Sequence, residues 1–508
     1  MSFNKNIQSS WLLFWSVASL LLALTIWPFA NNHYPAMPDF ANHLARLHLL
    51  TGQVHDGWQE YYYLHQEIVP NLALDIIASG FVSLGLSPRS ALMLFAAITN
   101  ILVVAGVISI SYAINRRPPW LALWAFIFAF NRYFIWGFLN YFFSIGIGFL
   151  VFSLWVLTDN KKYQYIWKLV LSFLLFTVLL SHLMGYGITL ICIFAYEFSK
   201  TIQRRLNLSE QIKHLSQLCA YFLPSFLFYV FVCVHGESHE VIYQDYFRSK
   251  VSGLISPFLS YNFLSAFIYI QGFVFIVYLI SRKKSGFKEL INAHFPNGLY
   301  LLPLVFVLLF LVLPTAMMGS WYLDKRFFIV ALLIMIAISN IEIASKPVIA
   351  IIITVTTLHV VKIYEVNNTW IKQSIVMPKI SSALNTIPVN AKIESFAFGD
   401  SDIMPIPTIH HAVTMAITQR AALVPTLFAL PVNLESVGYK KPYDDWAYST
   451  GTFNQNASLE ILRYACDNWY DYYLITYMNK VPKVPNCLEV MISDSNFTLY
   501  HVNRDYKD

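Results

Sequence analysis

The sequence predicts an α-helical polytopic membrane protein with about eleven transmembrane helices and a C-terminal α/β domain outside the membrane. The 508 residues are 57% hydrophobic and only 12% charged, with a mean hydropathy of +0.53. This composition excludes a water-soluble globular protein of this size. Apolar segments recur through residues 1–363, whereas residues 364–508 mix short helical and strand patterns. We therefore expect a transmembrane module at 1–363 and a separate domain at 364–508.

Segments of about 20 apolar residues can cross the hydrocarbon core as helices. The candidate spans are residues 11–29, 91–114, 118–131, 141–157, 166–181, 184–198, 215–234, 262–280, 298–314, 327–343 and 347–363. The first has one basic residue before it and no small-residue cleavage pattern after it, so we expect a retained signal anchor. The formal charge of +6 is spread over short loops, a pattern typical of topology signals and not of a nucleic-acid surface.

The stretch from Asn71 to Leu86 is ambiguous, because it has about sixteen residues and carries Asp75 in its first turns. We interpret it as an interfacial or re-entrant helix. The basic clusters then fall on one side, which the positive-inside rule makes the cytoplasm. They are Lys5, Arg116-Arg117, Lys161-Lys162, Lys200–Arg205, Arg282–Lys284 and Lys346. If the stretch crosses instead, the N-terminus is outside and the Asp39 loop inside, and loop charge leaves both topologies open.

In the topology that we favour, the N-terminus is cytoplasmic and an outer first loop spans 31–90. The other outward segments are Asn131–Asn140, Ser181–Gly185, His235–Tyr261, Thr315–Arg326 and the domain at 364–508. Chemistry at the outer face would assemble from these segments.

The C-terminal domain is expected to contain helices at Lys372–Leu384 and Leu459–Trp469. Strands are expected at Lys392–Phe398, Tyr472–Thr476 and Phe497–Val502. Cys466 and Cys487 could form a disulfide or remain free thiols, and their spacing supports both equally. No cysteine or histidine spacing indicates a metal site. The pair His410-His411 is interpreted as solvated or hydrogen-bonded histidines and not as metal ligands.

A polar cluster, Met37–Arg46, follows the first span. Pro38 restricts the chain, Asp39 is a good helix N-cap, and His43 and Arg46 follow at helical spacing. Helix capping at the membrane surface is one interpretation, but a cap requires neither the histidine nor the arginine. The other interpretation is a functional site.

The order of a first span, a long loop opening with an acid, further spans and a final α/β domain resembles the GT-C superfamily of membrane glycosyltransferases. The Asp39 motif also resembles an Asp-x-x-Asn-His-Leu-Ala-Arg signature of a group of bacterial membrane proteins. The resemblance implies a bacterial inner-membrane enzyme that is inverting, takes sugar from a polyprenyl-phosphate carrier and uses Asp39 as general base. It leaves a divalent metal open, but Asp39-Phe40 provides no acidic pair, so we name no metal ligand and no cofactor.

The remaining site residues follow from the chemistry that such an enzyme needs. Lys325 and Arg326 resemble phosphate-contacting residues, with snorkelling and pairing to Asp324 as the alternative. His182 lies between two short apolar runs, where it either packs or lines a lipid-head cavity. Arg132 and Asn140 belong to an aromatic hairpin that fits either a membrane aromatic belt or sugar binding. With His43 and Arg46, these complete the predicted substrate-binding residues.

The expected function is sugar transfer to an envelope glycan, lipid or protein acceptor, with no nucleic-acid partner. A lipid or glycan transporter would also have many spans, but we find no internal repeat of the kind that transporters show. A non-catalytic envelope protein that binds glycan would need neither Asp39 nor Arg326. Clustered polar residues on one side favour an enzyme.

Overall fold

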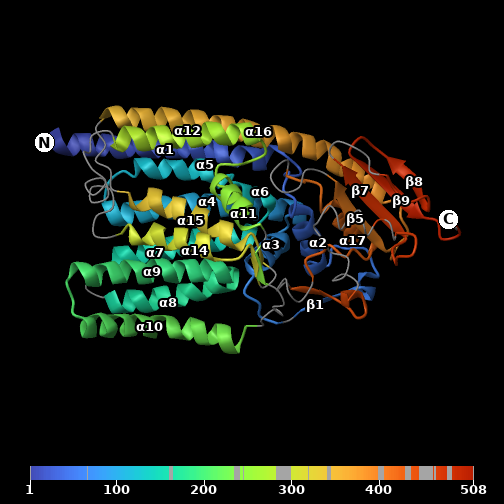
Figure 1. The fold of residues 1–508 in the computed structure, drawn as a ribbon, viewed down its shortest axis with the longest axis horizontal. Helices are drawn as coiled ribbons and strands as arrows, with labels where there is room; N and C mark the ends of the chain where they lie inside the picture. The colour runs from blue at the N-terminus through green and yellow to red at the C-terminus, as the bar shows by residue number, and fades with distance from the viewer. Residues whose placement is uncertain are drawn as a thin grey trace.

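The computed structural model describes residues 2–65, 67–159, 164–233, 241–243, 245–281, 299–317, 320–339, 345–398, 406–429, 436–445, 462, 465–477 and 483–506. Long helices lie side by side along the longest axis, and strands gather at one end (Figure 1). The long helices are α1 (Ser2–Asn31), α4 (Pro88–Asn115), α7 (Leu139–Thr158), α8 (Gln164–Ser181), α9 (Leu183–Gln203), α10 (Leu208–Phe231), α12 (Phe263–Ser281), α14 (Leu301–Val312), α15 (Leu323–Ile338) and α16 (Ser345–Leu384). A shorter stretch, η2 (Trp120–Trp124), α5 (Ala125–Ala129) and α6 (Arg132–Trp136), lies among them.

The long helices have the length and composition of membrane-spanning segments. Among the described residues, five helices are long and apolar enough to cross a membrane: 8–31, 88–115, 139–158, 208–231 and 347–384. Helical residues occupy every candidate span of the sequence, while the total of about eleven crossings stays a prediction. The basic clusters Lys161-Lys162 and Arg282–Lys284 lie outside the described residues.

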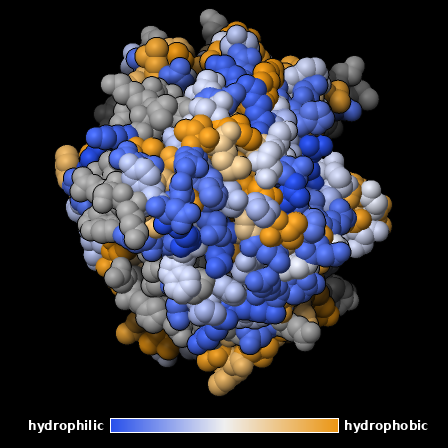
Figure 2. Space-filling view, turned by 90° about the vertical axis from the view of Figure 1, so that its right-hand side faces the viewer, coloured by the Kyte–Doolittle hydropathy of each residue, from blue (hydrophilic) through white to orange (hydrophobic). Residues whose placement is uncertain are grey.

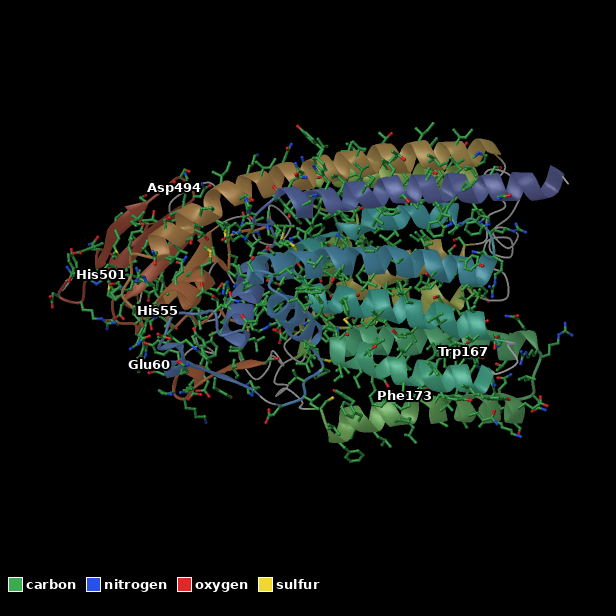
Figure 3. All side chains as sticks on the ribbon, turned by 180° about the vertical axis from the view of Figure 1, so that it is seen from behind. His55, Glu60, Trp167, Phe173, Asp494 and His501 are labelled. Atoms are coloured by element: carbon green, nitrogen blue, oxygen red, sulfur yellow. A yellow bond between two sulfur atoms is a disulfide. The ribbon has the colours of Figure 1, made fainter. Side chains whose placement is uncertain are left out.

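The helical part exposes large apolar side chains, whereas the surface of the strand-bearing end is mostly polar, as expected for a protein that lies partly in a bilayer. On α8, Trp167 and Phe173 are 50% and 74% exposed and project from the helical part (Figure 3). Asp494 and His501 lie at the opposite, strand-bearing end. Viewed from that end, the surface is largely hydrophilic (Figure 2). Large apolar side chains exposed along a bundle are stable only against lipid or a partner.

The ambiguous stretch after the first span forms a short helix, α3 (Ala73–Ser83). Its 11 residues cover about 16 Å at 1.5 Å per residue, against a hydrocarbon core about 30 Å thick. α3 lies beside α2 (Phe40–Leu50) at the strand-bearing end of the bundle (Figure 1). Its length and place support the interfacial interpretation.

The helix that contains the last expected span, 347–363, continues beyond it. α16 continues unbroken for 40 residues, through the expected domain boundary at 363/364 and through the expected helix at Lys372–Leu384. Polar residues of its middle part have partners inside the protein, which removes the need for a loop there. Glu365 accepts hydrogen bonds from the backbone N–H groups of Tyr261 and Asn262, and Asn367 accepts one from Asn32.

The C-terminal region contains a four-stranded sheet in the order β5-β7-β9-β8. The strands are β5 (Ile393–Phe398), β7 (Tyr472–Tyr477), β8 (Leu488–Ser493) and β9 (Phe497–Val502). β5 and β7 are parallel, and the other two pairs are antiparallel. Three of these strands match the sequence-based expectation, β8 was not expected, and Cys466 and Cys487 form a disulfide. Of the helix expected at Leu459–Trp469, residues 465–469 form turns and bends instead of a helix, and 459–461 and 463–464 lie outside the described residues.

The first loop and the C-terminal region form one unit, which we call the cap: the described residues of 32–87 and 385–506. Strand β1 (Tyr62–Leu64) pairs with β6 (Val437–Tyr439). Helix α2 shares a core with η4 (Ala412–Thr414) and α17 (Met415–Arg420), in which Ala41, Ala45 and Leu49 contact the C-terminal residues. A short 3₁₀ helix, η1 (Trp58–Glu60), completes the first-loop part. The two segments are therefore positioned together above the bundle.

Two small elements complete the strand-bearing end of the bundle. Strands β2 (Val241–Ile242), β3 (Ala316–Met317) and β4 (Ser320–Trp321) form a three-stranded sheet. Helix α11 (Tyr246–Ile255) lies beside the start of α15 and exposes Tyr246, Phe247 and Val251.

Candidate active site

Asp39 lies at the meeting point of α2, the turn between α6 and α7, and the C-terminal part of the cap. It occupies the N-cap position of α2, but its side chain forms no capping hydrogen bond. Its backbone N–H donates to the carbonyl of Trp136 over 3.1 Å. Its carboxyl is 5% exposed, with Oδ1 3.6 Å from Nε2 of His411. The capping interpretation of this acid is therefore not realised in the structure.

A glycine makes room for this carboxyl. Gly137 has φ of +121°, which favours glycine, and a Cβ there would lie 2.5 Å from Cβ of Asp39. His43 donates from Nε2 to the Gly137 carbonyl over 3.0 Å. Its other ring nitrogen, Nδ1, is buried and has no hydrogen-bond partner among the described residues. His43 thus fixes the turn beneath Asp39 and keeps one unused acceptor.

The charge state of Asp39 is set by opposing effects. Burial raises the pKa of its carboxyl well above the ordinary value, and the positive charge of Arg326 lowers it. Burial and the charge of Arg46 hold the pKa of His43 at about 3, so that ring is neutral. A buried carboxylate with a raised pKa is a stronger proton acceptor than an exposed one.

Arg326 begins α15 with its guanidinium turned inward. Its Nη2 donates to the carbonyl of Trp321 over 2.7 Å, and its Cζ lies 4.0 Å from the ring centre of Phe138 and 5.3 Å from that of Tyr141. Its Nε is buried and has no hydrogen-bond partner among the described residues. The side chain is therefore not snorkelled into water.

The acid next to Arg326 has another partner. Asp324 is fully buried and forms an ion pair with Lys250 of α11 at 2.7 Å. The alternative in which Asp324 neutralises Arg326 is thus not what the structure contains. Residue Gly319 of the same segment lies outside the described residues.

His182 lies next to Arg326 but has a local role. Its Nδ1 accepts a hydrogen bond from the backbone N–H of Met184 over 3.1 Å and caps α9. Its ring centre is 5.7 Å from that of Tyr141, whose hydroxyl donates to the carbonyl of Arg326. His182 therefore packs as a cap at the edge of the cationic site.

A cavity of about 340 Å³ lies beside these groups, between α6, α11 and the starts of α12 and α15. Arg132, Arg248 and Lys325 are among its lining residues, together with apolar side chains such as Phe247 and Phe263, and the surface that faces the cavity is mostly apolar. A wall of this kind suits a phosphate attached to a hydrocarbon chain.

An aromatic cluster lies next to the cavity and contacts the basic residues of the site. Tyr322, at φ of +57°, also lines the cavity. Its ring centre lies 6.2 Å from Tyr133, 5.5 Å from Trp136 and 6.4 Å from Phe138. Arg326 lies over Phe138, Lys325 over Tyr322 and Arg132 over Trp136, at 4.0, 5.0 and 5.8 Å from the ring centres. Asp39 and His43 contact the same turn through the carbonyls of Trp136 and Gly137, and His182 packs on Tyr141 next to Arg326.

Two residues predicted to bind substrate are engaged elsewhere. Arg46 is fully buried and forms an ion pair with Asp75 of α3 at 2.9 Å, and Asp75 also accepts from Ser436. Asn140 accepts from the backbone N–H of Leu74 and donates to Asn71. Both side chains anchor α3, and a role for them in substrate binding stays a prediction that these contacts do not favour.

The site also contains residues that sequence reasoning passed over. His411, expected to be a solvated or hydrogen-bonded histidine, is hydrogen-bonded to Asn42, and its ring also lies 3.6 Å from Asp39, which was not expected. Gly137 and Tyr141, in and next to the aromatic hairpin, are not among the predicted site residues. No local signal identifies them, because their importance depends on segments that meet only in the fold. Among the described residues, no group of three or more His, Cys, Asp or Glu could hold a metal ion.

Two solved structures are similar to this chain. ArnT from Cupriavidus metallidurans in the apo state aligns with a TM-score of 0.41 and 9% identity, over 97% of this chain and 98% of that chain. The archaeal oligosaccharyltransferase AglB from Archaeoglobus fulgidus, in complex with an inhibitory peptide and a dolichol-phosphate, aligns with a TM-score of 0.40 and 10% identity, over 91% of this chain and 69% of that chain. No protein-family model and no curated protein matches the sequence. Similarity at this level does not establish an activity, so the functional argument rests on the site.

Proposed function

We propose that this chain is a membrane glycosyltransferase that moves a sugar from a polyprenyl-phosphate carrier to an envelope glycan, lipid or protein at the outer face of a bacterial inner membrane. One observation carries the proposal. Asp39 has a buried carboxyl to which no described residue donates a hydrogen bond, and it faces a buried guanidinium whose Nε is unused. Buried polar groups without partners are costly. Leaving several in one place is explained by a substrate that supplies the missing partners.

The reaction is a single displacement. An acceptor hydroxyl attacks the anomeric carbon of the sugar, the bond from that carbon to the phosphate oxygen breaks, and the hydroxyl proton passes to Asp39. Negative charge collects on the departing carrier phosphate, where Arg326 offers a planar pair of donors and Lys325 a point charge. Inversion at the anomeric carbon follows from the one-step geometry.

The cavity supports the donor assignment. Arg132, Arg248 and Lys325 are among its lining residues, beside exposed apolar residues of α11 that would lie in the outer leaflet. A carrier phosphate can be held by these basic residues while its isoprenoid chain extends into lipid. The aromatic cluster around Tyr322 offers ring faces on which a sugar can stack.

The test is transfer by the purified chain in lipid vesicles that contain polyprenyl-phosphate sugars, with Asp39→Asn as the decisive variant. A general base contributes about 10²- to 10⁴-fold, so we expect a loss of that size with unchanged folding. The matched control is Asp494→Asn, which makes the same change at an exposed carboxyl paired with Lys379. Equal turnover by the parent and the Asp39→Asn protein would remove Asp39 from the mechanism.

The outer-face assignment has its own test. In a cysteine-free background, single cysteines at Asn31 and Asn115 should react from the outside and the inside, respectively, with a membrane-impermeant maleimide. Asn31 is exposed and ends α1, and Asn115 ends α4, so the two lie at opposite ends of the bundle. Labelling of position 31 only after the inner face is opened would contradict this orientation.

A further inference from the structure

His411 is the group of the C-terminal segment that lies closest to the proposed base. Its ring is 1% exposed, and its Nε2 lies 3.6 Å from Oδ1 of Asp39. Its other nitrogen, Nδ1, lies 3.4 Å from the side-chain nitrogen of Asn42 on α2. The imidazole is therefore held between an amide and the carboxyl, with one ring nitrogen toward each.

The orientation of Asn42 is fixed by two backbone groups. Its Oδ1 accepts from the N–H of Phe428 over 2.8 Å, and its Nδ2 donates to the carbonyl of Thr426 over 2.5 Å. An amide NH₂ group has two hydrogens. With one directed to Thr426, the second faces Nδ1 of His411.

This contact assigns the tautomer of the imidazole. Nδ1 of His411 faces a donor and must accept, and a neutral imidazole that accepts at Nδ1 carries its hydrogen at Nε2. That hydrogen points toward Oδ1 of Asp39. Hydrogen bonds in unliganded active sites are often long and tighten when substrate binds.

We propose that His411 is a positioning residue for the base: as a neutral ring it donates from Nε2 to Asp39, orients the carboxylate and favours its charged form. The inference rests on the proposed function, because it assigns a partner to the base of that reaction. It also means that the base is completed by the C-terminal segment, more than 300 residues further along the chain.

The charged and titratable neighbours agree with this role. His43 on α2, Arg326 on α15 and His410 next in the chain face the pair. Burial, His410 and His43 lower the pKa of His411 well below its ordinary value, so the ring is neutral at physiological pH. Burial raises the pKa of Asp39, and Arg326 opposes it. A neutral donor at Oδ1 adds to the effect of Arg326 and keeps the carboxylate available as a base.

The first experiment is the pH profile of kcat/KM for the parent, His411→Phe and His411→Gln. Phenylalanine keeps a ring but loses the donor, whereas the glutamine amide can place an N–H near the same oxygen. Because a hydrogen bond to a charged group is lost, we expect His411→Phe to move the acid limb upward by about one to two pH units. We expect His411→Gln to restore part of the shift, and KM for the donor to stay unchanged in both variants.

The matched control is His501→Phe. His501 belongs to β9 in the same cap and packs against Tyr472, away from Asp39. The acid limb of the pH profile of His501→Phe should coincide with that of the parent. If His411→Phe lowered turnover but left the acid limb at the parental pH, His411 would be only a packing residue. That result would overturn the proposal.

A second experiment does not depend on activity. A membrane-permeable carbodiimide reacts with protonated carboxyl groups, and mass spectrometry measures the modified fraction of Asp39 at each pH. The midpoint should lie higher in His411→Phe than in the parent and in His501→Phe, with His411→Gln between them. If no transfer is found but this order holds, the proposed function fails and the pairing stands. Equal midpoints in all four proteins would refute the pairing itself.

Discussion

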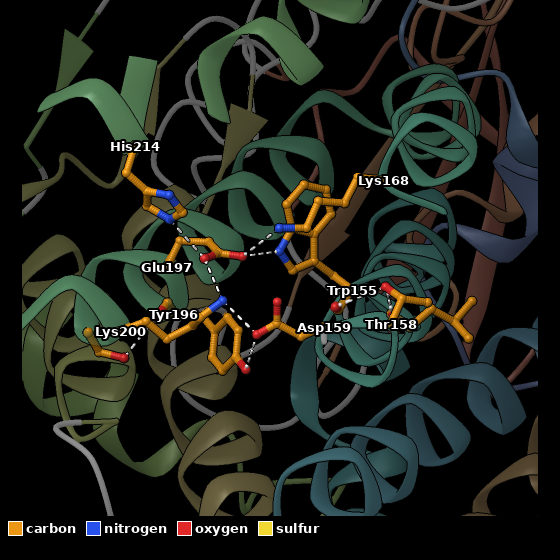
Figure 4. Close-up of polar contacts among 10 residues, drawn as sticks. Trp155, Thr158, Asp159, Lys168, Tyr196, Glu197, Lys200 and His214 are labelled. Atoms are coloured by element: carbon orange, nitrogen blue, oxygen red, sulfur yellow. Dashed lines mark hydrogen bonds and ion pairs between the residues drawn. The ribbon is translucent and has the colours of Figure 1, made fainter. Parts of the chain in front are cut away.

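Two buried carboxylates of this protein differ in how fully they are satisfied. Glu197 on α9 is completely buried and accepts on both oxygens (Figure 4). Trp155 and Lys168 contact Oε1 at 2.7 and 3.3 Å, and Lys200 and His214 contact Oε2 at 2.9 and 3.1 Å. Asp39 is nearly as buried, yet among the described residues its side chain has only the 3.6 Å approach of His411.

The two carboxylates therefore have different roles, although the side chains around them are of the same kinds. The cluster around Glu197 joins α7, α8, α9 and α10 by charge pairs and hydrogen bonds (Figure 4). A buried carboxylate that is saturated in this way holds helices together and has nothing left for a ligand. The site at Asp39 has the same kinds of side chain but leaves polar atoms unused. The following experiments test this contrast, from the largest expected effect to the smallest.

Replacing Glu197 should affect stability and not chemistry. Glu197→Ala leaves the buried Lys168 without its acid, while Lys200 keeps its ion pair with Asp159 at 2.6 Å, and breaking a buried pair typically costs about 3 to 5 kcal/mol. Unfolding of the purified protein in detergent measures the loss. Turnover per folded molecule should remain at the parental value. If it fell like that of Asp39→Asn, the cluster would belong to the catalytic machinery, and the contrast would be lost.

Gly137→Ala should affect mainly catalysis, which is the opposite of what we expect for Glu197→Ala. The added methyl group would lie 2.5 Å from Cβ of Asp39, at a backbone conformation of φ +121° that alanine adopts poorly. A displacement of about 1 Å in a catalytic group can cost about 10²-fold in rate, so kcat should fall by roughly that factor.

The matched control for this variant is Gly187→Ala on α9, where an added Cβ meets nothing within 4 Å. Parental kcat is expected there. A Gly137→Ala protein with parental kcat would show that the position of Asp39 is not critical.

The contrast also explains which parts of the structure can be predicted from sequence. The helices were predictable because lipid imposes long apolar segments, and β5, β7 and β9 because their apolar runs are short and bounded by polar residues. Asp39 and Arg326 could be named because an ionisable residue near a span requires a reason. The length of α16 could not be predicted, since the partners that bury Glu365 come from α12 and the segment before it.

It was harder to predict which residues belong to the site than to predict which chemistry their side chains could provide. Arg46 and Asn140 carry the right chemistry, but the fold directs them to Asp75 and Asn71. His411 carries equally suitable chemistry and reaches Asp39 only because β1 pairs with β6 and α2 packs against η4. Residue type therefore indicates what a side chain can do, and tertiary contacts decide whether it is engaged.

Arg326 tests the claim that unused donors serve a ligand. Charge-assisted bonds contribute about 1.5 to 3 kcal/mol, so Arg326→Ala should lower kcat/KM for the lipid donor about 10- to 100-fold. Arg326→Lys should recover only part of the loss, because a lysine lacks the planar pair of donors. Arg504→Lys, at an exposed arginine paired with Asp471, is the control. Unchanged donor kinetics in Arg326→Ala would assign Arg326 to packing against Phe138.

The smallest effect concerns stability and its dependence on pH. The native pKa of Asp39 is raised above the ordinary value of 3.8, chiefly by burial. An acid with a raised native pKa contributes its stabilisation below the ordinary value and loses it as pH rises through the native value. The parent should therefore match Asp39→Asn in acid and become progressively less stable than it toward neutral pH.

Asp494→Asn provides a comparison of opposite sign. Lys379 holds the pKa of Asp494 at about 2, so this acid stabilises the protein above its ordinary pKa and loses that contribution as pH falls toward 2. Melting temperatures of the parent and both variants, measured from pH 2 to pH 8 in one detergent, give the two slopes: that of Asp494 below its ordinary pKa of 3.8 and that of Asp39 above 3.8. If the parent were more stable than Asp39→Asn at neutral pH, the Asp39 carboxylate would be as fully hydrogen-bonded and charge-paired as that of Glu197. The physical argument for Asp39 as a general base would then fail.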